Sequence, residues 1–220
     1  MKVYAVIPAY NEEKTIQEVV KKTRKYCPVI VVDDGSDDKT AKLAKKSRAI
    51  LIKHIENKGY GKSLIDGIKN AIAFNADYVI TLDSDGQHNP DDIPKFIESL
   101  EGGYDIVSGS RFLDKKSWGT KKRMAAIKLL TYQAKIFSRL KLTDIQSGFR
   151  GYNTRIFRKI KLEDSGMGFS VELPIKAKKK GFSFTEVPIR IRKPHNIKTF
   201  WHAFKQGVEV SLAIVKHSLF

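Results

Sequence analysis

Short apolar runs alternate with amphipathic segments through the first half of the chain. The apolar runs are expected to form buried strands at 3–8, 29–32, 50–52, 78–82 and 105–108. The segments between them repeat apolar residues at helical spacing and are expected to be helices at 11–26, 37–47, 63–75 and 92–100. Such alternation is typical of β-α-β units. The sequence therefore predicts an α/β fold with a mostly parallel central sheet flanked by helices.

The second half of the chain is less regular. A helix rich in basic and apolar residues is expected at 121–140, a strand within 182–192 and a final helix at 199–220, whereas 144–152 has the composition of a loop. A chain of 220 residues suffices for one full-sized α/β domain. We therefore expect one domain at 1–195, followed by a C-terminal amphipathic helix at 196–220.

Three polar clusters follow three of the expected strands. They are Pro8-Ala9-Tyr10-Asn11-Glu12, Asp33-Asp34-Gly35-Ser36 and Asp83-Ser84-Asp85-Gly86-Gln87. In a parallel sheet, ligands bind beyond the carboxyl ends of the strands. Three polar clusters at one edge of one sheet therefore indicate a binding site.

The third cluster has the residue types of a metal site. Asp83 and Asp85 are two positions apart, and their charges repel each other unless a cation lies near both. Oxygen ligands suit Mg²⁺ or Mn²⁺, and such an ion could neutralise a departing diphosphate. Gln87 could add a neutral oxygen ligand, whereas His88 is expected outside the coordination shell. A solvated loop or a helix cap is the alternative.

The other two clusters suit a nucleoside. Asp34 could accept hydrogen bonds from a base or a ribose, Tyr10 could stack near a base, and Glu12 could bind ribose hydroxyls. Alternatively, these clusters are a helix cap and a proline turn before a capped helix. The segment 57–62 contains glycines and lysines but lacks the spacing of a P-loop.

The net charge of the chain indicates which class of partner it binds. Lysine and arginine number 41 against 24 aspartates and glutamates, which gives a formal net charge of +17. This excess favours an anionic partner, such as a phosphorylated substrate or an anionic membrane surface, although a lysine-rich solvated face is an alternative. A nucleic-acid-binding module would leave the acidic clusters unexplained, because they would repel phosphates. We therefore expect no nucleic-acid partner.

Cysteine content and hydropathy bear on location. Cys27 is the only cysteine, so no internal disulfide is possible; a packing role and a reducing compartment are expected. The N-terminal run lacks the features of a signal peptide, and no stretch is apolar enough to predict a membrane span. We expect catalysis on the cytoplasmic side, with peripheral membrane attachment or attachment through a membrane-protein partner.

Together the motifs resemble family 2 glycosyltransferases, and more closely their dolichol-phosphate mannosyltransferase and polyprenyl-phosphate glycosyltransferase branch. Besides the three clusters, the resemblance rests on Asn57-Lys58-Gly59, Gly109-Ser110-Arg111-Phe112, Ser147-Gly148-Phe149-Arg150-Gly151-Tyr152 and Glu186-Val187-Pro188-Ile189. It implies a GT-A (Rossmann-like) fold and a divalent metal. It also implies inverting transfer of a hexose, mannose or glucose, from a GDP- or UDP-sugar to a polyprenyl or dolichyl phosphate. The domain would then comprise a nucleotide-sugar-binding half at 1–110 and an acceptor half at 111–195.

The resemblance also implies roles for individual residues. Contacts with the nucleotide sugar are expected from Pro8, Tyr10, Glu12, Asp34, Lys58, Asp83 and Ser84. The metal ligands are expected to be Asp85 and Gln87, together with Asp83. Asp85 and Arg111 are expected to act in catalysis. Contacts with phosphate or acceptor are expected from Arg111, Arg150, Arg192 and Lys198.

The acceptor decides whether a general base is needed. Transfer to a hydroxyl requires a base, whereas a phosphate oxygen is already anionic at neutral pH. Glu172 is the best candidate for a catalytic base, and a helix-start or salt-bridge role is its alternative. Arginines are abundant in the acceptor half and suit phosphate oxygens, so we favour a lipid phosphate. Transfer to a sugar or protein hydroxyl, and metal-dependent nucleotidyl transfer, stay open.

Two helices of the second half have membrane-surface patterns. The expected stripe of helix 121–140 consists of Met124, Ile127, Leu130, Ala134 and Phe137. The expected stripe of the last helix consists of Phe200, Phe204, Val208, Leu212, Val215 and Leu219, flanked by Trp201, Lys205 and Lys216. Basic amphipathic helices with aromatic residues often lie in a bilayer interface. Packing on the protein's own core, on a partner subunit or on a second copy in a homo-oligomer is the alternative.

Overall fold

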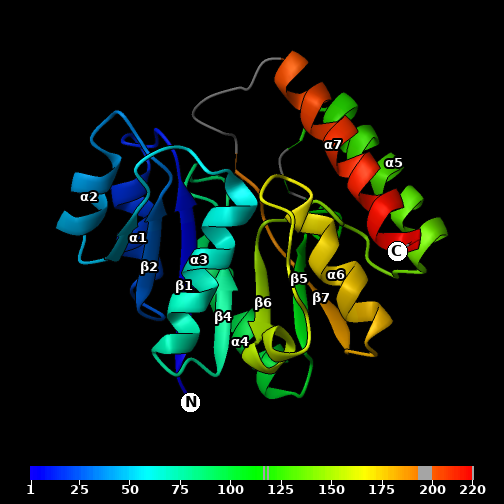
Figure 1. Ribbon diagram of the computed structural model, residues 1–220, viewed down its shortest axis with the longest axis horizontal. Coiled ribbons are helices and arrows are strands. Elements are labelled where there is room, and N and C mark those ends of the chain that lie inside the picture. The colour runs from blue at the N-terminus through cyan, green and yellow to red at the C-terminus, as the bar shows by residue number, and fades with distance from the viewer. Residues whose placement is uncertain (116, 118, 193–199, 220) are drawn as a thin grey trace.

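The computed structural model describes residues 1–115, 117, 119–192 and 200–219. In this part of the chain seven strands form one sheet in the order β3-β2-β1-β4-β6-β5-β7, and helices cover both faces (Figure 1). The strands are β1 Val3–Ala9, β2 Val29–Asp33, β3 Ile50–Lys53, β4 Tyr78–Thr81, β5 Ile106–Ser110, β6 Arg150–Asn153 and β7 Phe184–Pro188. The helices are α1 Ile16–Thr23, α2 Thr40–Lys46, α3 Tyr60–Ala73, α4 Ile93–Glu101, α5 Lys121–Ser138, α6 Phe169–Lys179 and α7 Phe200–Leu219, with short 3₁₀ turns at Pro90–Asp92 and Thr154–Arg158. The predicted α/β fold is confirmed.

β6 is the antiparallel member of this mostly parallel sheet. It runs antiparallel to both β4 and β5, whereas the other neighbouring pairs are parallel. The expectation that 144–152 is a loop is therefore wrong for its last three residues. The strand has only four residues, and Gly151 interrupts the run of side chains by which a strand is recognised in a sequence. A Cβ at Gly151 would lie 2.9 Å from a Leu100 methyl carbon, so glycine allows α4 to pack closely on this strand.

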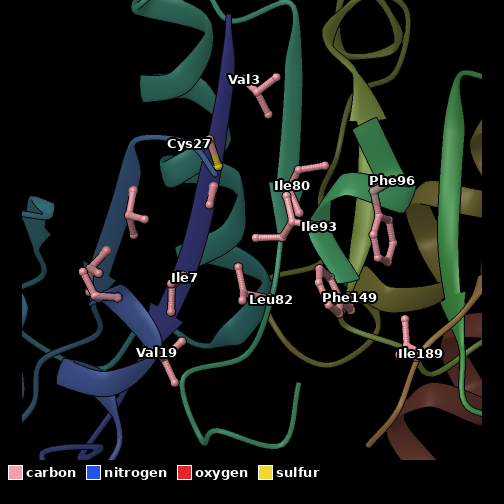
Figure 2. Close-up of a cluster of buried hydrophobic side chains, with 14 of the residues drawn as sticks. Val3, Ile7, Val19, Cys27, Ile80, Leu82, Ile93, Phe96, Phe149 and Ile189 are labelled. Atoms are coloured by element: carbon pink, nitrogen blue, oxygen red, sulfur yellow. The ribbon is translucent and has the colours of Figure 1, made fainter. Parts of the chain in front are cut away.

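Apolar clusters fill both sides of the sheet. One cluster joins the sheet to α1, α2 and α4, and Figure 2 shows its members Ile7, Leu82, Phe96 and Phe149. Cys27 belongs to the same cluster, and burial raises the pKa of its thiol to about 12, in keeping with a packing role. The other cluster joins the sheet to α3 and α6.

α5 and α7 form the far end of the molecule, where they pack against each other and against α6 (Figure 1). Ile127, Leu130 and Ala134 of α5 are buried, Leu130 and Ala134 in a cluster with residues of α6 and α7. At these three residues the apolar stripe expected on α5 therefore packs on the protein's own core, which was the alternative to a membrane surface. None of the helices in the described part of the chain is long and apolar enough to cross a bilayer.

Helix boundaries differ from the expected ones at several points. The helix expected at 11–26 is limited to Ile16–Thr23, and the one expected at 63–75 begins earlier, at Tyr60. α6 had no clear counterpart in the sequence pattern. Most residues of α6 are buried on all sides of the helix, so the sequence lacks the alternation of apolar and polar faces that would indicate a helix.

Candidate active site

The carboxyl ends of β2, β1 and β4 lie side by side. β1 pairs in parallel with both β2 and β4, so the three polar clusters emerge at one edge of the sheet. Hydrogen bonds join the first two clusters directly. The Asp34 amide donates to the carbonyl of Ala9 at 2.8 Å, and the Asn11 amide donates to Ser36 Oγ at 3.0 Å. The convergence expected from the sequence is therefore present.

The Asp34 carboxylate is buried and held by donors of one segment. The backbone amides of Lys58 and Gly59 donate to its two oxygens at 2.9 Å each. His54 Nδ1 lies 2.7 Å from Asp34 Oδ1, and the other ring nitrogen lies 3.2 Å from Asp66 Oδ2. Asp34 is thus fixed by the segment 54–59, next to the predicted nucleoside position.

The tip of β4 carries the acidic pair. Asp83 Oδ1 accepts a hydrogen bond from the Tyr60 hydroxyl at 3.0 Å, and the Asp83 amide donates to His88 Nδ1 at 3.1 Å. Burial and the neighbouring Asp83 raise the pKa of Tyr60 well above its ordinary value. Asp85 accepts hydrogen bonds from the backbone amide and side chain of Gln87. The Asp83 side chain keeps 33% of its surface exposed.

These residues fit a divalent ion that is shared with a substrate. No group of three or more His, Cys, Asp or Glu side chains in the described ranges is placed to hold a metal alone. Mg²⁺ is commonly bound by one or two carboxylates together with substrate phosphates, and Asp83 and Asp85 supply such a pair. The side-chain oxygen of Gln87 accepts a hydrogen bond from Arg123 at 3.1 Å. The carboxylates are therefore the stronger candidates for ligands.

Arg123 lies close to the acidic tip formed by Asp83 and Asp85, and Arg111 lies near Arg123. Arg111 follows β5, and its Nε lies 2.5 Å from Oδ2 of the fully buried Asp144. Arg123 comes from α5. The pKa of its guanidinium group is lowered, mainly by burial and then by the nearby charge of Arg111, while Asp85 acts in the opposite direction. Paired guanidinium groups suit an anionic ligand such as a phosphate.

The remaining arginine and lysine candidates have different surroundings. Arg192 borders the tip, since its amide donates to the Gln87 carbonyl at 2.9 Å. Arg150 is 1% exposed, and its guanidinium donates to the carbonyls of Ser170 and Ile145. Arg150 therefore lies in the core, where backbone carbonyls hold its guanidinium group. Lys198 lies outside the described residues.

Glu172, the candidate for a base, lies fully buried in α6. Its oxygens accept hydrogen bonds from the amides of Glu163 and Asp164 at 2.9 Å each, and Lys176 Nζ lies 2.6 Å away. Burial alone would raise the pKa of Glu172, but Lys176 and the two amides hold it below its ordinary value. The structure therefore shows the salt-bridge role that was its alternative.

The other donor-side candidates differ in exposure. Tyr10 is 46% exposed and Lys58 is also exposed, so both side chains can be reached from solution. Pro8 and Ser84 are buried. Glu12 Oε2 accepts a hydrogen bond from Thr15 at 2.9 Å.

Several residues at this edge were not among the predicted site residues. They are His54, Tyr60, Arg123 and Gly148, and a Cβ at Gly148 would lie only 2.7 Å from Asp83 Oδ1. Gly148 and Tyr60 lie in or beside motifs noted in the sequence, which is the signal that could have found them. Arg123 had no such signal, because it is one of many basic residues in its segment.

A mostly parallel sheet with an acidic strand tip at its carboxyl edge fits the GT-A class of glycosyltransferases. The family model described as glycosyl transferase family 2 matches residues 4–161, and the chain belongs to this family.

Curated relatives extend the similarity over most of the chain. UDP-N-acetylglucosamine–dolichyl-phosphate N-acetylglucosaminyltransferase of Methanococcus voltae is 34% identical over 215 residues, which cover 86% of this chain and 84% of the relative. Undecaprenyl-phosphate mannosyltransferase of Micrococcus luteus is 32% identical over 203 residues, which cover 86% of this chain and 83% of the relative.

Among solved structures, glucosyl-3-phosphoglycerate synthase of Mycobacterium tuberculosis has a similar fold. That structure holds Mn²⁺, uridine diphosphate and glucosyl-3-phosphoglycerate. The TM-score is 0.80 at 21% sequence identity, covering 99% of this chain and 80% of that chain. This likeness supports the GT-A fold.

Proposed function

We propose that this glycosyltransferase moves a hexose, mannose or glucose, from a GDP- or UDP-sugar to a polyprenyl or dolichyl phosphate, with inversion and with Mg²⁺ or Mn²⁺. The observation that carries this proposal is the acidic pair Asp83 and Asp85 beside the guanidinium group of Arg123, which in turn neighbours Arg111. The lipid-phosphate acceptors of the two curated relatives support the acceptor class. The Mn²⁺ and nucleotide of the solved neighbour support the donor and the metal.

On the donor side, this chain's residues bind and orient the nucleotide. Asp34 is fixed by backbone amides and accepts further hydrogen bonds from the nucleoside, while the exposed Tyr10 ring lies against the base. Asp83 and Asp85 would hold the divalent ion at the diphosphate end of the site. When bound, a divalent ion supplies positive charge that offsets the charge growing on the leaving nucleoside diphosphate.

On the acceptor side, a phosphate needs no proton acceptor in the enzyme. Glu172 is enclosed by protein donors, so it takes no part in the proposed chemistry. Arg111 and Arg123 instead orient the phosphate and reduce the repulsion between the anionic acceptor and the anionic donor.

A lipid acceptor requires contact with a membrane, and α5 and α7 offer apolar surface for it. Leu129, Tyr132 and Ile136 of α5 are 69%, 63% and 57% exposed, and Leu212 and Leu219 of α7 are 65% and 64% exposed. Exposed lysines accompany them on both helices: Lys121, Lys122, Lys128, Lys135, Lys205 and Lys216. In the proposal this surface lies peripherally on the cytoplasmic face of an anionic bilayer.

Product analysis tests the proposal. The protein is incubated with GDP-mannose, GDP-glucose, UDP-glucose or UDP-N-acetylglucosamine, with Mn²⁺ or Mg²⁺, and with a polyprenyl phosphate in vesicles or a soluble sugar acceptor. We expect a glycosylated lipid phosphate and a released nucleoside diphosphate. A product formed only on the hydroxyl acceptor would contradict the acceptor assignment. In a parallel incubation with a nucleoside triphosphate and a sugar phosphate, release of pyrophosphate would indicate nucleotidyl transfer.

A vesicle sedimentation experiment tests the membrane surface separately. The L129E/I136E variant should lose binding to vesicles that contain anionic lipid, whereas E98Q, on the distant helix α4, should bind as the wild-type protein does. Binding unchanged by L129E/I136E would place the membrane contact elsewhere.

A further inference from the structure

The segment 57–60 touches both acidic clusters of the site at once. The amides of Lys58 and Gly59 donate to Asp34, and the hydroxyl of the next residue, Tyr60, donates to Asp83 Oδ1 at 3.0 Å. One short turn at the start of α3 therefore connects the predicted nucleoside contact with the predicted metal ligand.

The backbone of this turn is itself held tightly in place. The amide of Lys62 donates to the carbonyl of Ser165 at 3.0 Å. Gly59 has a φ of +97°, and a Cβ there would lie 2.5 Å from the Ser165 carbonyl oxygen. A Cβ at Gly61 would lie 2.4 Å from the Asp164 carbonyl oxygen. The turn thus has little freedom, and the position of the Tyr60 ring is fixed with it.

The hydrogen bond between Tyr60 and Asp83 is enclosed by the loop before β6. A Cβ at Gly148 would lie 2.7 Å from both the Tyr60 hydroxyl oxygen and Asp83 Oδ1. Thr81 Oγ1 donates to the Gly148 carbonyl at 2.8 Å and so fixes that loop over the contact. Since a carboxylate oxygen only accepts, the phenolic hydroxyl is the donor.

We propose that Tyr60 is a positioning residue of the donor site, because its hydroxyl fixes the orientation of the Asp83 carboxylate toward the metal and the nucleotide diphosphate. The inference rests on the proposed function. Asp83 and Asp85 repel each other while no cation lies between them, so a carboxylate held only by its own rotamer preference would turn away. A donor on Oδ1 holds Asp83 in place and leaves the exposed part of its side chain for the ligand.

Binding measurements on Tyr60→Phe test the inference, since this change removes the hydroxyl and keeps the ring. Calorimetric titrations with Mn²⁺ plus uridine diphosphate, and in a second series with Mn²⁺ plus guanosine diphosphate, should show affinity about tenfold below wild type, the size expected for a lost hydrogen bond to a charged group. The thermal midpoint should stay within a few degrees. Tyr104→Phe, at an exposed turn, is the matched control and should bind as wild type does.

A double-mutant cycle separates positioning from general packing. With Asp83→Asn already present, Tyr60→Phe should cause little further loss of affinity. Equal losses in both backgrounds, or wild-type affinity in Tyr60→Phe, would overturn the inference. If Tyr60→Phe proves unstable, Gly148→Ala disturbs the same contact from the other side and should likewise weaken binding.

Asp85→Asn, measured in parallel, tests the proposed function. Wild-type binding of Mn²⁺ and nucleotide in Asp85→Asn would overturn the metal assignment and this inference with it. Loss of binding in Asp85→Asn together with wild-type binding in Tyr60→Phe would overturn the inference alone.

Discussion

His54 and Asp34 form a buried pair whose nearest atoms, Nδ1 and Oδ1, are 2.7 Å apart. The opposite ring nitrogen of His54 lies 3.2 Å from Asp66, which in turn pairs with Lys62. This chain of contacts reaches from the surface of α3 to the proposed nucleoside contact, Asp34. It gives Asp34 a side-chain support besides the two backbone amides.

Removing the imidazole should therefore weaken nucleotide binding. We expect His54→Ala to lower the affinity for a nucleoside diphosphate by about tenfold, because Asp34 loses a donor and gains freedom. Calorimetry measures the affinity, and kcat at saturating donor should change little. Asp66→Asn, one contact further away, should have a smaller effect in the same direction. An unchanged affinity in His54→Ala would contradict this role.

Asp85→Asn should reduce metal-dependent turnover by about a hundredfold or more while the protein stays folded. The amide keeps the size of the side chain but loses the negative charge that attracts a divalent ion. Steady-state assays across a Mn²⁺ titration give the effect, with circular dichroism as the check on folding. Wild-type-like activity would remove Asp85 from the metal site.

Arg111→Ala should lower both stability and phosphate binding. Asp144 is fully buried beside Arg111, so removal of the guanidinium leaves an unpaired charge and should cost about 3–5 kcal/mol of unfolding free energy. Denaturant unfolding measures the loss, and Arg111→Ala combined with Asp144→Ala should recover part of it. Unchanged KM and kcat in the folded Arg111→Ala protein would exclude Arg111 from the site.

Arg123→Ala should act on the acceptor rather than on stability. We expect the KM for a polyprenyl phosphate to rise by about tenfold, because one guanidinium contact with the phosphate is lost. Kinetics with the acceptor varied at saturating donor measure this change. Lys122→Ala removes the neighbouring exposed charge and serves as the control. Equal effects of the two variants would indicate a general charge effect instead.

Glu172→Gln should destabilise the protein without impairing catalysis. Since the pKa of Glu172 is lowered in the folded state, its contribution to stability is present above the unfolded value of about 4.3 and is lost as the pH falls through the folded value. Unfolding curves at several pH values should show a loss near neutral pH that shrinks in acid. A large fall in kcat of the folded variant would restore Glu172 as a base.

Residue patterns were sufficient to predict the parallel core and the meeting of the acidic clusters. Both follow from local rules, because parallel strands place their carboxyl ends at one edge. Tyr60, His54 and Arg123 could not be placed in this way. Their contacts depend on how α3 and α5 pack on the sheet. The motif that contains Tyr60 marks its segment but does not reveal its contact with Asp83, and no pattern marks His54 or Arg123.

Glu172 and Arg150 show the same limit of sequence analysis, because both were predicted to act in the site and both lie buried in the core. A charged residue in a motif suggests chemistry, but both side chains are buried and their partners are mostly backbone groups. Burial is a property of the assembled fold. The sequence pattern around Arg150 was also too short to reveal β6.

The position of β6 has a consequence for protein engineering. This strand comes from the later half of the chain, yet it separates β4 from β5, which both belong to the earlier half. A chimera that joins residues 1–110 to the remainder of a relative would thus replace β6, the strand that lies between β4 and β5, with that of the relative. A chimera that exchanges the later half of the chain between relatives should therefore fold only when the residues of β4 and β5 that pair with β6 are exchanged as well.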